Sequence, residues 1–262
     1  MIRDNPVKQT LAGGGTAFGA MIFEFFSPGI PQICKNAGAD YVLFDMEHTG
    51  LGFETLKNQF ALCRGLSVVP MVRVPRGEYP FIARALDVGA FGVMVPMVGT
   101  AEEARHIVSC TRYPPLGRRG AAFGFAHDDY QGGDVVEKIA ALHQRTMVIP
   151  QIETAEGLAN VEAIAAVPGV DALWLGQMDL SNFLGISGQF KHPKFLAAVD
   201  RIVAACETHG KAAALLAMDD DWARDFAAKG FRLMAYGVDS LMLQGALAHG
   251  LGLLRATWRP KG

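Results

Sequence analysis

The sequence has few of the features that mark secreted proteins, membrane proteins or proteins with structural metal sites. Its four cysteines, Cys34, Cys63, Cys110 and Cys206, are widely separated and form no C-x-x-C pair, so a structural zinc site is not expected. Each falls in a helical pattern, where a small buried thiol is typical of a reducing cytoplasm. The first twenty residues carry charges of both signs and no apolar core, so we expect no signal peptide.

Excess charge and long apolar runs are also missing. The 24 Lys and Arg residues against 26 Asp and Glu residues leave a formal net charge of -2, which does not favour binding to nucleic acid. No apolar stretch approaches the roughly 20 residues that a membrane helix needs, so we expect no membrane partner. A chain of 262 residues, 50% of them hydrophobic, fits one large α/β domain over residues 1–262.

What the sequence does contain is a regular alternation of short apolar runs with amphipathic stretches. Continuous apolar runs are expected of strands that are buried on both faces. The glycine-rich stretch at 12–20 precedes the first run instead of following it, which argues against a dinucleotide-binding sheet. Eight strands alternating with helices predict a (β/α)₈ barrel. The predicted strands span 19–23, 41–47, 68–74, 92–98, 147–153, 171–176, 212–217 and 232–237.

Polar side chains gather where four of these strands end. In a barrel the carboxyl ends of the strands meet around one mouth, and burying several polar groups there without a purpose is costly. The sequence therefore predicts a site at the mouth. Its candidate residues are Asp45, Glu47, His48, Arg73, Gln151, Glu153 and Asp179.

Two of these carboxylates suit a divalent cation. Glu153 and Asp179 follow neighbouring strands with no obvious third protein ligand, and Mg²⁺ and Mn²⁺ bind through one or two carboxylates plus water and substrate oxygens. Each also has an ordinary explanation, because Glu153 suits the first turn of a helix and Asp179 suits an N-cap. Arg73 at the end of an apolar strand requires an anionic partner, such as a carboxylate or an enolate oxygen.

No lysine falls on a predicted strand. Barrel aldolases of the Schiff-base type need a lysine on an inner strand. The nine lysines of this chain lie in predicted helices, loops or termini. Amine catalysis is therefore not expected, and a metal ion remains as the means of stabilising an enolate.

Seven stretches between residues 40 and 240 carry a set of motifs in a fixed order, within a resemblance that runs from about residue 11 to about residue 255. They are DYVLFDMEH, VVPMVRVP, ALDVGAFGVMVPMV, TRYPPLGRRG, VIPQIETAEGLANV, GQMDLS and GVDS. Together they resemble the HpcH/HpaI aldolase/citrate lyase family, and within it the metal-dependent class II pyruvate aldolases. The resemblance implies a (β/α)₈ barrel of the phosphoenolpyruvate/pyruvate type that reversibly cleaves a 4-hydroxy-2-oxo acid to pyruvate and an aldehyde.

The resemblance also implies a role for each matching residue. It implies that a divalent metal ion is bound, with Mg²⁺ or Mn²⁺ ahead of Co²⁺ or Zn²⁺, and that Asp45 and Glu47 orient the histidine and the metal's waters. Where the family usually has Pro and then Ala or Ser, this chain has Gln177 and Met178, which bears on the substrate more than on the chemistry. The implied roles are general base for His48, enolate stabiliser for Arg73, enhancer of histidine basicity for Asp87, substrate contact for Gln151 and Met178, metal ligand for Glu153, and both metal ligand and substrate contact for Asp179.

Assembly and two other functions complete the expectations. The resemblance implies a homo-oligomer, commonly a hexamer built as a trimer of dimers with exchanged C-terminal helices. The apolar stretch 241–258 is compatible with that exchange and equally with a helix that closes the barrel. The longest irregular stretch, 113–133, is of a length that is usually functional or mobile. The alternatives are a lyase acting on a CoA thioester and a catalytically silent barrel that binds an oxo acid.

Overall fold

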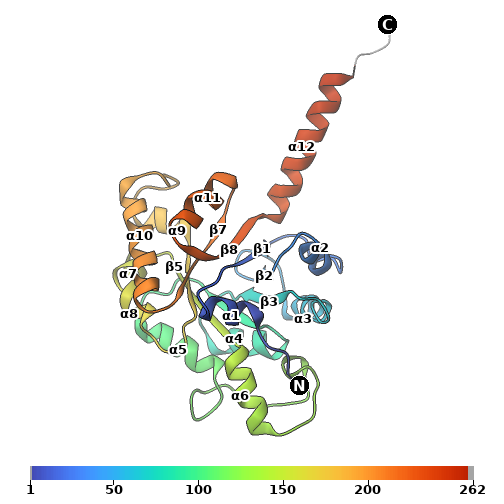
Figure 1. Cartoon of the computed structure of the whole chain (residues 1–262), viewed down its shortest axis with the longest axis vertical. Helices are drawn as coiled ribbons and strands as arrows, with labels where there is room; N and C mark the ends of the chain where they lie inside the picture. Colours follow the sequence, from blue (N-terminus) through green and yellow to red (C-terminus); the bar gives the residue numbers. More distant parts are fainter. Residues whose placement is uncertain (1, 259–262) are drawn as a thin grey trace.

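The computed structural model describes residues 2–258 and contains a closed barrel of eight parallel strands (Figure 1). Each strand pairs with its neighbour in the sequence, and β8 returns to pair with β1. The predicted (β/α)₈ barrel is confirmed, and every strand overlaps the range predicted for it. The strands are β1 (Ala17–Ile22), β2 (Tyr41–Asp45), β3 (Val69–Arg73), β4 (Gly92–Val95), β5 (Met147–Ile152), β6 (Ala172–Leu175), β7 (Ala212–Ala217) and β8 (Phe231–Val238).

The strands are mostly apolar because both faces of most of them are buried, and their few polar side chains include Asp45 and Arg73 at the ends of β2 and β3. Successive strand side chains point to opposite sides of a sheet. On β2, Tyr41 and Leu43 belong to the cluster that fills the barrel, whereas Val42 and Phe44 belong to the larger cluster beneath the helices. The edge-to-face contact between Phe44 and Phe60, with ring centroids 5.9 Å apart, joins β2 to the outer layer.

Most of the helices surround the barrel on its outer side (Figure 1), whereas α1 packs Val7 and Leu11 against the cluster that fills the barrel. Their starts follow local chemistry: Thr100 and Glu103, for example, form a reciprocal capping box at the start of α5. All four cysteines are buried, as predicted, and none of them is paired. The helices are α1 (Pro6–Ala12), α2 (Ile30–Asn36), α3 (Phe53–Leu62), α4 (Tyr79–Asp87), α5 (Ala101–Thr111), α6 (Val135–Arg145), α7 (Ala155–Ala159), α8 (Val161–Ala165), α9 (Gln177–Phe183), α10 (Pro193–Thr208), α11 (Asp220–Ala228) and α12 (Asp239–Thr257).

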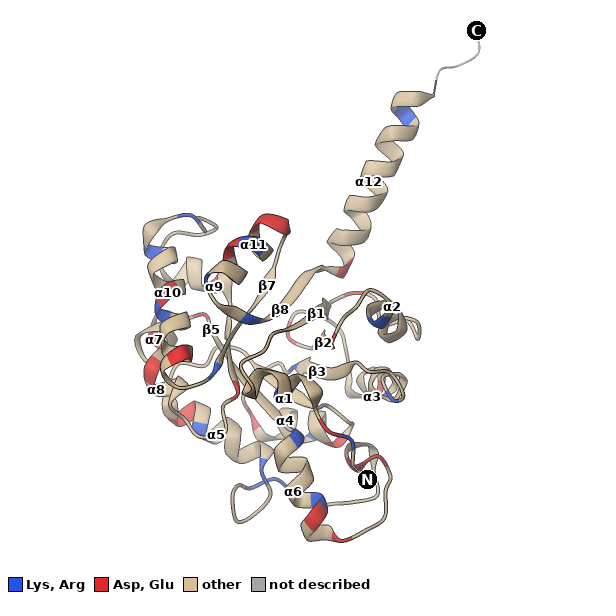
Figure 2. Ribbon diagram, viewed as in Figure 1, with Lys and Arg blue, Asp and Glu red and all other residues tan. Residues whose placement is uncertain are grey.

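The last helix leaves the barrel instead of packing against it. Figure 1 shows α12 projecting from the end of β8, and none of its residues is buried. Gly237 makes this departure possible, because its φ of +69° suits glycine and a side chain there would overlap Met242. Figure 2 shows charges of both signs spread over the barrel, whereas α12 carries only Asp239 and Arg255. Among the described residues, no helix is both long and apolar enough to span a membrane.

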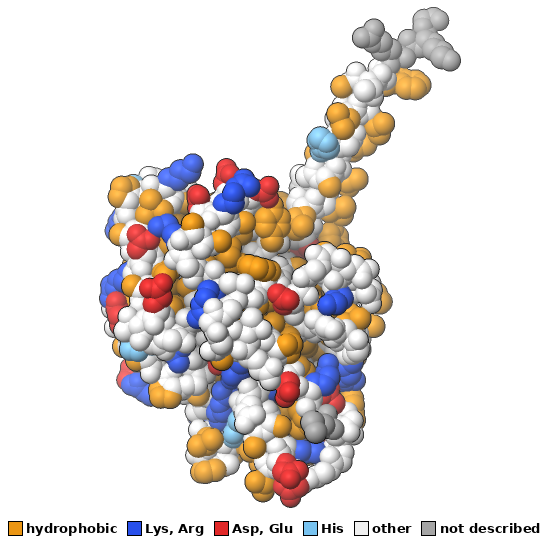
Figure 3. Space-filling view, in the orientation of Figure 1, with side chains coloured by type: hydrophobic (Ala, Val, Ile, Leu, Met, Phe, Trp, Pro, Cys, Tyr) orange, Lys and Arg blue, Asp and Glu red, His pale blue; other side chains and the backbone are white. Residues whose placement is uncertain are grey.

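A hollow remains at the base of α12. It has a volume of about 590 Å³ and lies between β1, α2 and the end of β8, with Phe18, Ile33 and Tyr236 in its lining. These three side chains are exposed, as are the leucines along α12. Figure 3 shows the apolar side chains of the projecting helix in orange. Single exposed apolar side chains are ordinary, but a contiguous group of them around a hollow is not.

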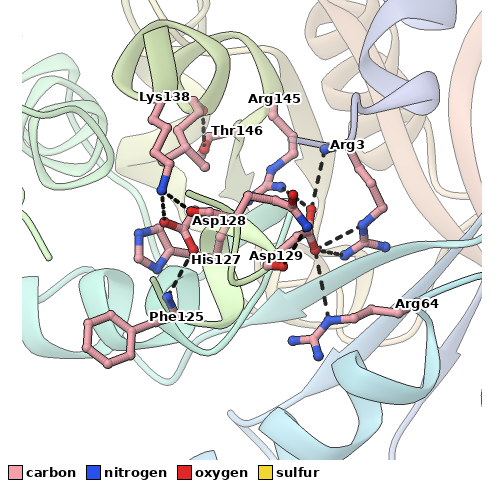
Figure 4. Close-up of polar contacts among 11 residues, drawn as sticks. Arg3, Arg64, Phe125, His127, Asp128, Asp129, Lys138, Arg145 and Thr146 are labelled. Atoms are coloured by element: carbon pink, nitrogen blue, oxygen red, sulfur yellow. Dashed lines mark hydrogen bonds and ion pairs between the residues drawn. The ribbon is translucent and has the colours of Figure 1, made fainter. Parts of the chain in front are cut away.

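Buried ion pairs fix the irregular stretch 113–133 at the amino end of the barrel (Figure 4). A short 3₁₀ helix, η1 (Ala126–Asp128), lies in it. Asp128 pairs with Lys138 at 2.8 Å, and Asp129 accepts hydrogen bonds from the backbone and the guanidinium of Arg3. Arg145 lies 3.6 Å from Asp129 and donates to the backbone oxygen of His127. The middle of this stretch is therefore anchored to the N-terminal segment and to α6.

Replacing Asp129 with asparagine should destabilise the fold by about 2–4 kcal/mol at neutral pH, because the guanidinium groups around it lose their counter-charge. Asparagine tolerates the φ of +56° at this position, so backbone strain is not added. Urea unfolding would measure the loss. The Asp200→Asn variant, which removes the exposed partner of Lys229, should cost less than about 1 kcal/mol.

The difference in unfolding free energy between wild type and Asp129→Asn should depend on pH in a defined way. Burial opposes ionisation of Asp129, but hydrogen bonds and charge from Arg3 outweigh it and hold the pKa below its ordinary value of 3.8. The wild-type advantage should therefore be present above that value and disappear as the pH falls through the lowered pKa. Equal unfolding free energies for wild type and Asp129→Asn at pH 7 would contradict this account.

Candidate active site

Charged side chains from four elements meet at the carboxyl ends of the barrel strands. Asp45 ends β2, Glu47 follows in the next turn, and Arg73 ends β3. Glu153 directly follows β5, and Asp179 lies in the first turn of α9. The charges of Glu47 and Asp179 lie close enough to Glu153 to raise its pKa, and the charge of Asp179 also raises the pKa of Glu47. The fold therefore brings these residues together at one mouth, as the sequence predicts.

Arg73 is held in one position by two carboxylates. Its Nε donates to Asp45 Oδ1 at 2.5 Å, and its Nη1 lies 3.0 Å from Glu47 Oε2. The guanidinium carbon lies 5.7 Å from the ring centroid of Phe23. Asp45 is fully buried and the side chain of Arg73 is 7% exposed, so this ion pair is largely shielded from solvent. A fixed, buried cation at the mouth is suited to stabilise negative charge on a bound molecule.

Asp45 also shapes the turn that carries the candidate base. Its carboxylate accepts hydrogen bonds from the backbone N–H of Glu47 at 3.3 Å and of His48 at 2.9 Å. The imidazole of His48 is 58% exposed, and its Nε2 lies 3.7 Å from Glu47 Oε2. The backbone of His48 is thus bound by the same carboxylate that holds Arg73, while its ring is exposed.

Glu153 is a buried acid among other acids. Its carboxylate accepts the backbone N–H of Met97 at 2.7 Å and a hydrogen bond from the side-chain amide of Gln151. Burial raises the pKa of Glu153 to about 7, against the Met97 hydrogen bond, and the charges of Glu47 and Asp179 raise it further. Met97 has a φ of +59°, which is uncommon for a residue other than glycine, so its backbone geometry is specialised for this contact.

Gly176 leaves the space that Glu153 occupies. A β-carbon at this position would overlap the Glu153 carboxylate and the Gln151 amide. The glycine at the end of β6 is therefore required for the buried acid to sit where it does. Gln177 follows it and is anchored by a 3.0 Å hydrogen bond from its side-chain amide to the backbone oxygen of Leu216.

The donor set at the mouth fits a hard cation. The mouth holds four carboxylates, those of Asp45, Glu47, Glu153 and Asp179, of which the first two are paired with the guanidinium of Arg73. Burial raises the pKa of Glu47 as well, against the nearby Arg73 and His48 and with Asp45 and Asp179 adding to the rise. The side-chain oxygen of Gln151 is buried without a hydrogen-bond partner. Within residues 2–258, no three His, Cys, Asp or Glu side chains form a ready-made metal cluster, so an ion here would need water or substrate oxygens as further ligands.

Two predicted site residues lie apart from this group. Asp87 is at the end of α4, which leads into the amino end of β4, and so it lies at the opposite end of the barrel from His48. It is bound there by Arg119 Nη2 at 2.7 Å. Met178 lies in the first turn of α9 and is 55% exposed, so its side chain borders the mouth without being fixed in it.

Sequence reasoning missed three contributors to the site. The backbone N–H of Met97 binds Glu153, the ring of Phe23 lies beside Arg73, and the glycine character of Gly176 leaves space for Glu153. The glycine was a readable signal, since it directly follows a strand and precedes the D-L-S motif. A backbone donor and an apolar ring carry no signal of their own in a single sequence.

A barrel with a charged carboxyl-end mouth defines an enzyme scaffold, and comparison with known proteins identifies which one. The family model described as HpcH/HpaI aldolase/citrate lyase matches residues 21–246, and the chain belongs to this family. A hydroxypyruvate/pyruvate aldolase of Delftia acidovorans is 38% identical over 254 residues, which cover 97% of this chain and 93% of that protein. A 2-keto-3-deoxy-L-rhamnonate aldolase of Klebsiella pneumoniae is 33% identical, with 96% and 94% covered.

The structural comparison agrees with the sequence comparison. The crystal structure of an HpcH/HpaI aldolase from Desulfitobacterium hafniense matches with a TM-score of 0.91 at 30% identity, covering 97% of this chain and 99% of that one. The expected family and fold are confirmed. The chain is an enzyme, a carbon–carbon lyase of the aldolase type.

The raised pKa of Glu153 predicts how stability depends on pH when EDTA is present. Between its ordinary pKa of 4.5 and about 7, the folded state holds a proton that the unfolded chain has released. The unfolding free energy should therefore fall as the pH rises through this interval, by on the order of 2–3 kcal/mol. Glu153→Gln should remove this part of the dependence, as measured by urea unfolding from pH 4.5 to 8.

A neighbouring acid provides the control. Glu156 lies on the exposed first turn of α7, and Glu156→Gln should retain the wild-type pH dependence. If Glu153→Gln loses stability over the same interval as steeply as wild type, the buried acid is not the source of the effect.

Proposed function

We propose that this enzyme reversibly cleaves a 4-hydroxy-2-oxo acid to pyruvate and an aldehyde with the help of a divalent metal ion. The observation that carries the proposal is a pair of acids, buried Glu153 and neighbouring Asp179, beside the fixed guanidinium of Arg73. Curated relatives named for hydroxypyruvate, pyruvate and 2-keto-3-deoxy-L-rhamnonate support a 2-oxo acid as the substrate class.

Glu153 and Asp179 would hold the ion. A site of two carboxylates with a surplus of negative charge suits Mg²⁺ or Mn²⁺, and Co²⁺ or Zn²⁺ would be less well matched to an all-oxygen set. When bound, such an ion supplies Lewis-acid polarisation of a carbonyl oxygen and shares the charge of an enolate. The ion would also relieve the mutual repulsion that, together with burial, raises the pKa of Glu153 and Glu47.

The chain's own residues carry the remaining steps. His48, directly or through a water molecule, takes the proton of the C4 hydroxyl as the C3–C4 bond breaks. The electron pair of that bond forms the pyruvate enolate, whose negative charge Arg73 stabilises, and protonation at C3 gives pyruvate. Gln151 contacts the oxo acid, and Met178 borders the space for the aldehyde. Asp87 and His48 lie at opposite ends of the barrel in one chain. The prediction that Asp87 raises the basicity of His48 therefore requires the Asp87 of another copy of the chain.

We also propose that α12 packs on another copy of the chain. A (β/α)₈ barrel ordinarily has a helix after its eighth strand that packs back on the barrel, and here that helix projects outward. The apolar hollow at its base is open, and the leucines of α12 are exposed. Exchange of α12 between copies would cover both surfaces, in keeping with the homohexamer, a trimer of dimers, that the family resemblance implies.

The cysteines support the compartment that we propose. All four thiols are buried and none is paired, and burial raises the pKa of Cys63 and Cys206 to about 12, which leaves both thiols protonated and unreactive. Unpaired thiols are maintained in a reducing compartment. We therefore propose that the enzyme works in the cytoplasm.

The proposed reaction predicts metal-dependent release of pyruvate. Purified enzyme should release pyruvate from 4-hydroxy-2-oxo acids of graded size, lose this activity in EDTA, and regain it with Mg²⁺ or Mn²⁺. The order of rates along the size series would show which aldehydes fit beside Met178. Failure to release pyruvate from any of these acids, with Mn²⁺ binding shown by calorimetry, would overturn the proposal.

Arg73→Ala should lower kcat by about 10²–10³ in the same assay, because a fixed cation facing the enolate would be lost. Arg105→Ala, which removes an exposed arginine of α5 paired with Glu102, should leave the rate unchanged. Near-normal turnover by Arg73→Ala would show that the enolate is stabilised without it.

The proposed exchange of α12 predicts a large particle in solution. Light scattering coupled to size exclusion should give about six times the 28.1 kDa of one chain. Leu247→Glu should yield smaller species, because a charge would be buried in the interface, whereas His249→Glu, on another side of the helix, should change the mass less. A wild-type mass of 28.1 kDa would contradict the proposal.

A further inference from the structure

The first residue of α12 binds a turn that belongs to the opposite end of the sequence. The carboxylate of Asp239 accepts three consecutive backbone N–H groups, those of Phe23 at 3.1 Å, Glu24 at 2.9 Å and Phe25 at 2.8 Å. These residues follow β1 at the mouth of the barrel. Because β8 pairs with β1, with Met21 opposite Val238, the contact lies at the seam where the barrel closes.

This use of Asp239 differs from ordinary helix capping. The N-cap of α12 is Val238, which has no side-chain hydrogen bond to the helix. An acid in the first turn of a helix is favoured by the helix dipole whatever it contacts. Here all three hydrogen bonds of the carboxylate go to the 23–25 turn and none to α12 itself. The residue therefore fixes the turn more than it fixes the helix.

The fixed turn reaches the candidate active site through one ring. Phe23 is half-buried, and its ring lies 5.7 Å from the guanidinium carbon of Arg73. Asp45 and Glu47 hold the guanidinium through its nitrogen atoms, and the guanidinium carbon lies over the ring of Phe23. An apolar wall beside a cation keeps water away from it and strengthens its action on a bound negative charge.

We propose that Asp239 is a positioning residue for the lyase reaction, acting on Arg73 through the 23–25 turn and the ring of Phe23. The inference rests on the proposed role of Arg73 in stabilising the enolate. It also ties the start of the projecting helix to the catalytic mouth, because the same residue begins α12 and holds the turn.

The first arm of the test measures the turn without reference to activity. In the full-length enzyme, Asp239→Asn retains one acceptor oxygen and Asp239→Ala retains none. Hydrogen–deuterium exchange of the peptide containing residues 23–25 should become faster in the order wild type, Asp239→Asn, Asp239→Ala. Glu24→Gln is the matched control, because it removes an exposed acid from the same turn without removing an acceptor, and it should exchange as wild type does.

The second arm measures catalysis. Pyruvate release by Asp239→Asn should show a kcat about 10- to 100-fold below wild type, the scale expected when a catalytic group is displaced slightly, with melting temperature and particle mass retained. In a Phe23→Leu background, Asp239→Asn should cause a much smaller further loss, because the ring through which it acts is already gone. A residue that only supports the fold would lower the melting temperature and add its effect to that of Phe23→Leu.

The outcomes separate the inference from the proposed reaction. Unchanged exchange at 23–25 would overturn the contact, and faster exchange with wild-type kcat would overturn the positioning role. Strictly additive effects of Asp239→Asn and Phe23→Leu would overturn the route through the ring. If wild type itself releases no pyruvate, the proposed reaction fails, and the affinity for pyruvate measured by calorimetry replaces kcat, with weaker binding in Asp239→Asn expected and unchanged binding contradicting the inference.

Discussion

The ion pair between Arg73 and Asp45 is the interaction on which the mouth of this barrel depends. Both groups are buried at the ends of adjacent strands, and the separation of those strands fixes the distance between them. The remaining oxygen of Asp45 then organises the turn that carries His48. A buried pair adds little net stability, since desolvation offsets the attraction. What this pair provides is a cation in one orientation, which is what charge stabilisation during a reaction requires.

The acids opposite this pair show the cost of building a reactive site. Burial raises the pKa of Glu153 to about 7, and repulsion from the charges of Glu47 and Asp179 adds to this rise. Gly176 and the unusual backbone of Met97 keep the acid in that place. Destabilising features of this kind concentrate at sites of function, and substitutions that relieve them commonly gain stability and lose activity. The barrel beneath, with its two apolar layers, supplies the stability that the mouth lacks.

The sequence was sufficient for the barrel and for most of the mouth, for a physical reason. Buried parallel strands must be apolar throughout, so they stand out as runs, and a polar residue at the end of a run marks the mouth. The site assignments of Glu153 and Asp179 followed from that rule. The same rule has nothing to say of Asp87, whose role came from family resemblance and whose helix places it at the other end of the barrel. The course of α12 was also open, because an apolar helix has the same composition whether it covers its own barrel or another.

The outward course of α12 has a consequence for how this chain reaches its final state. A barrel whose eighth helix points away keeps an apolar hollow open until something else fills it. If that filler is another copy, the last step of folding is bimolecular, and the measured stability must rise with protein concentration. Newly made chains at low concentration would then expose both the leucines of α12 and the apolar hollow at its base. In that case Gly237, whose backbone sets the direction of α12, would control self-association as well as bend the chain.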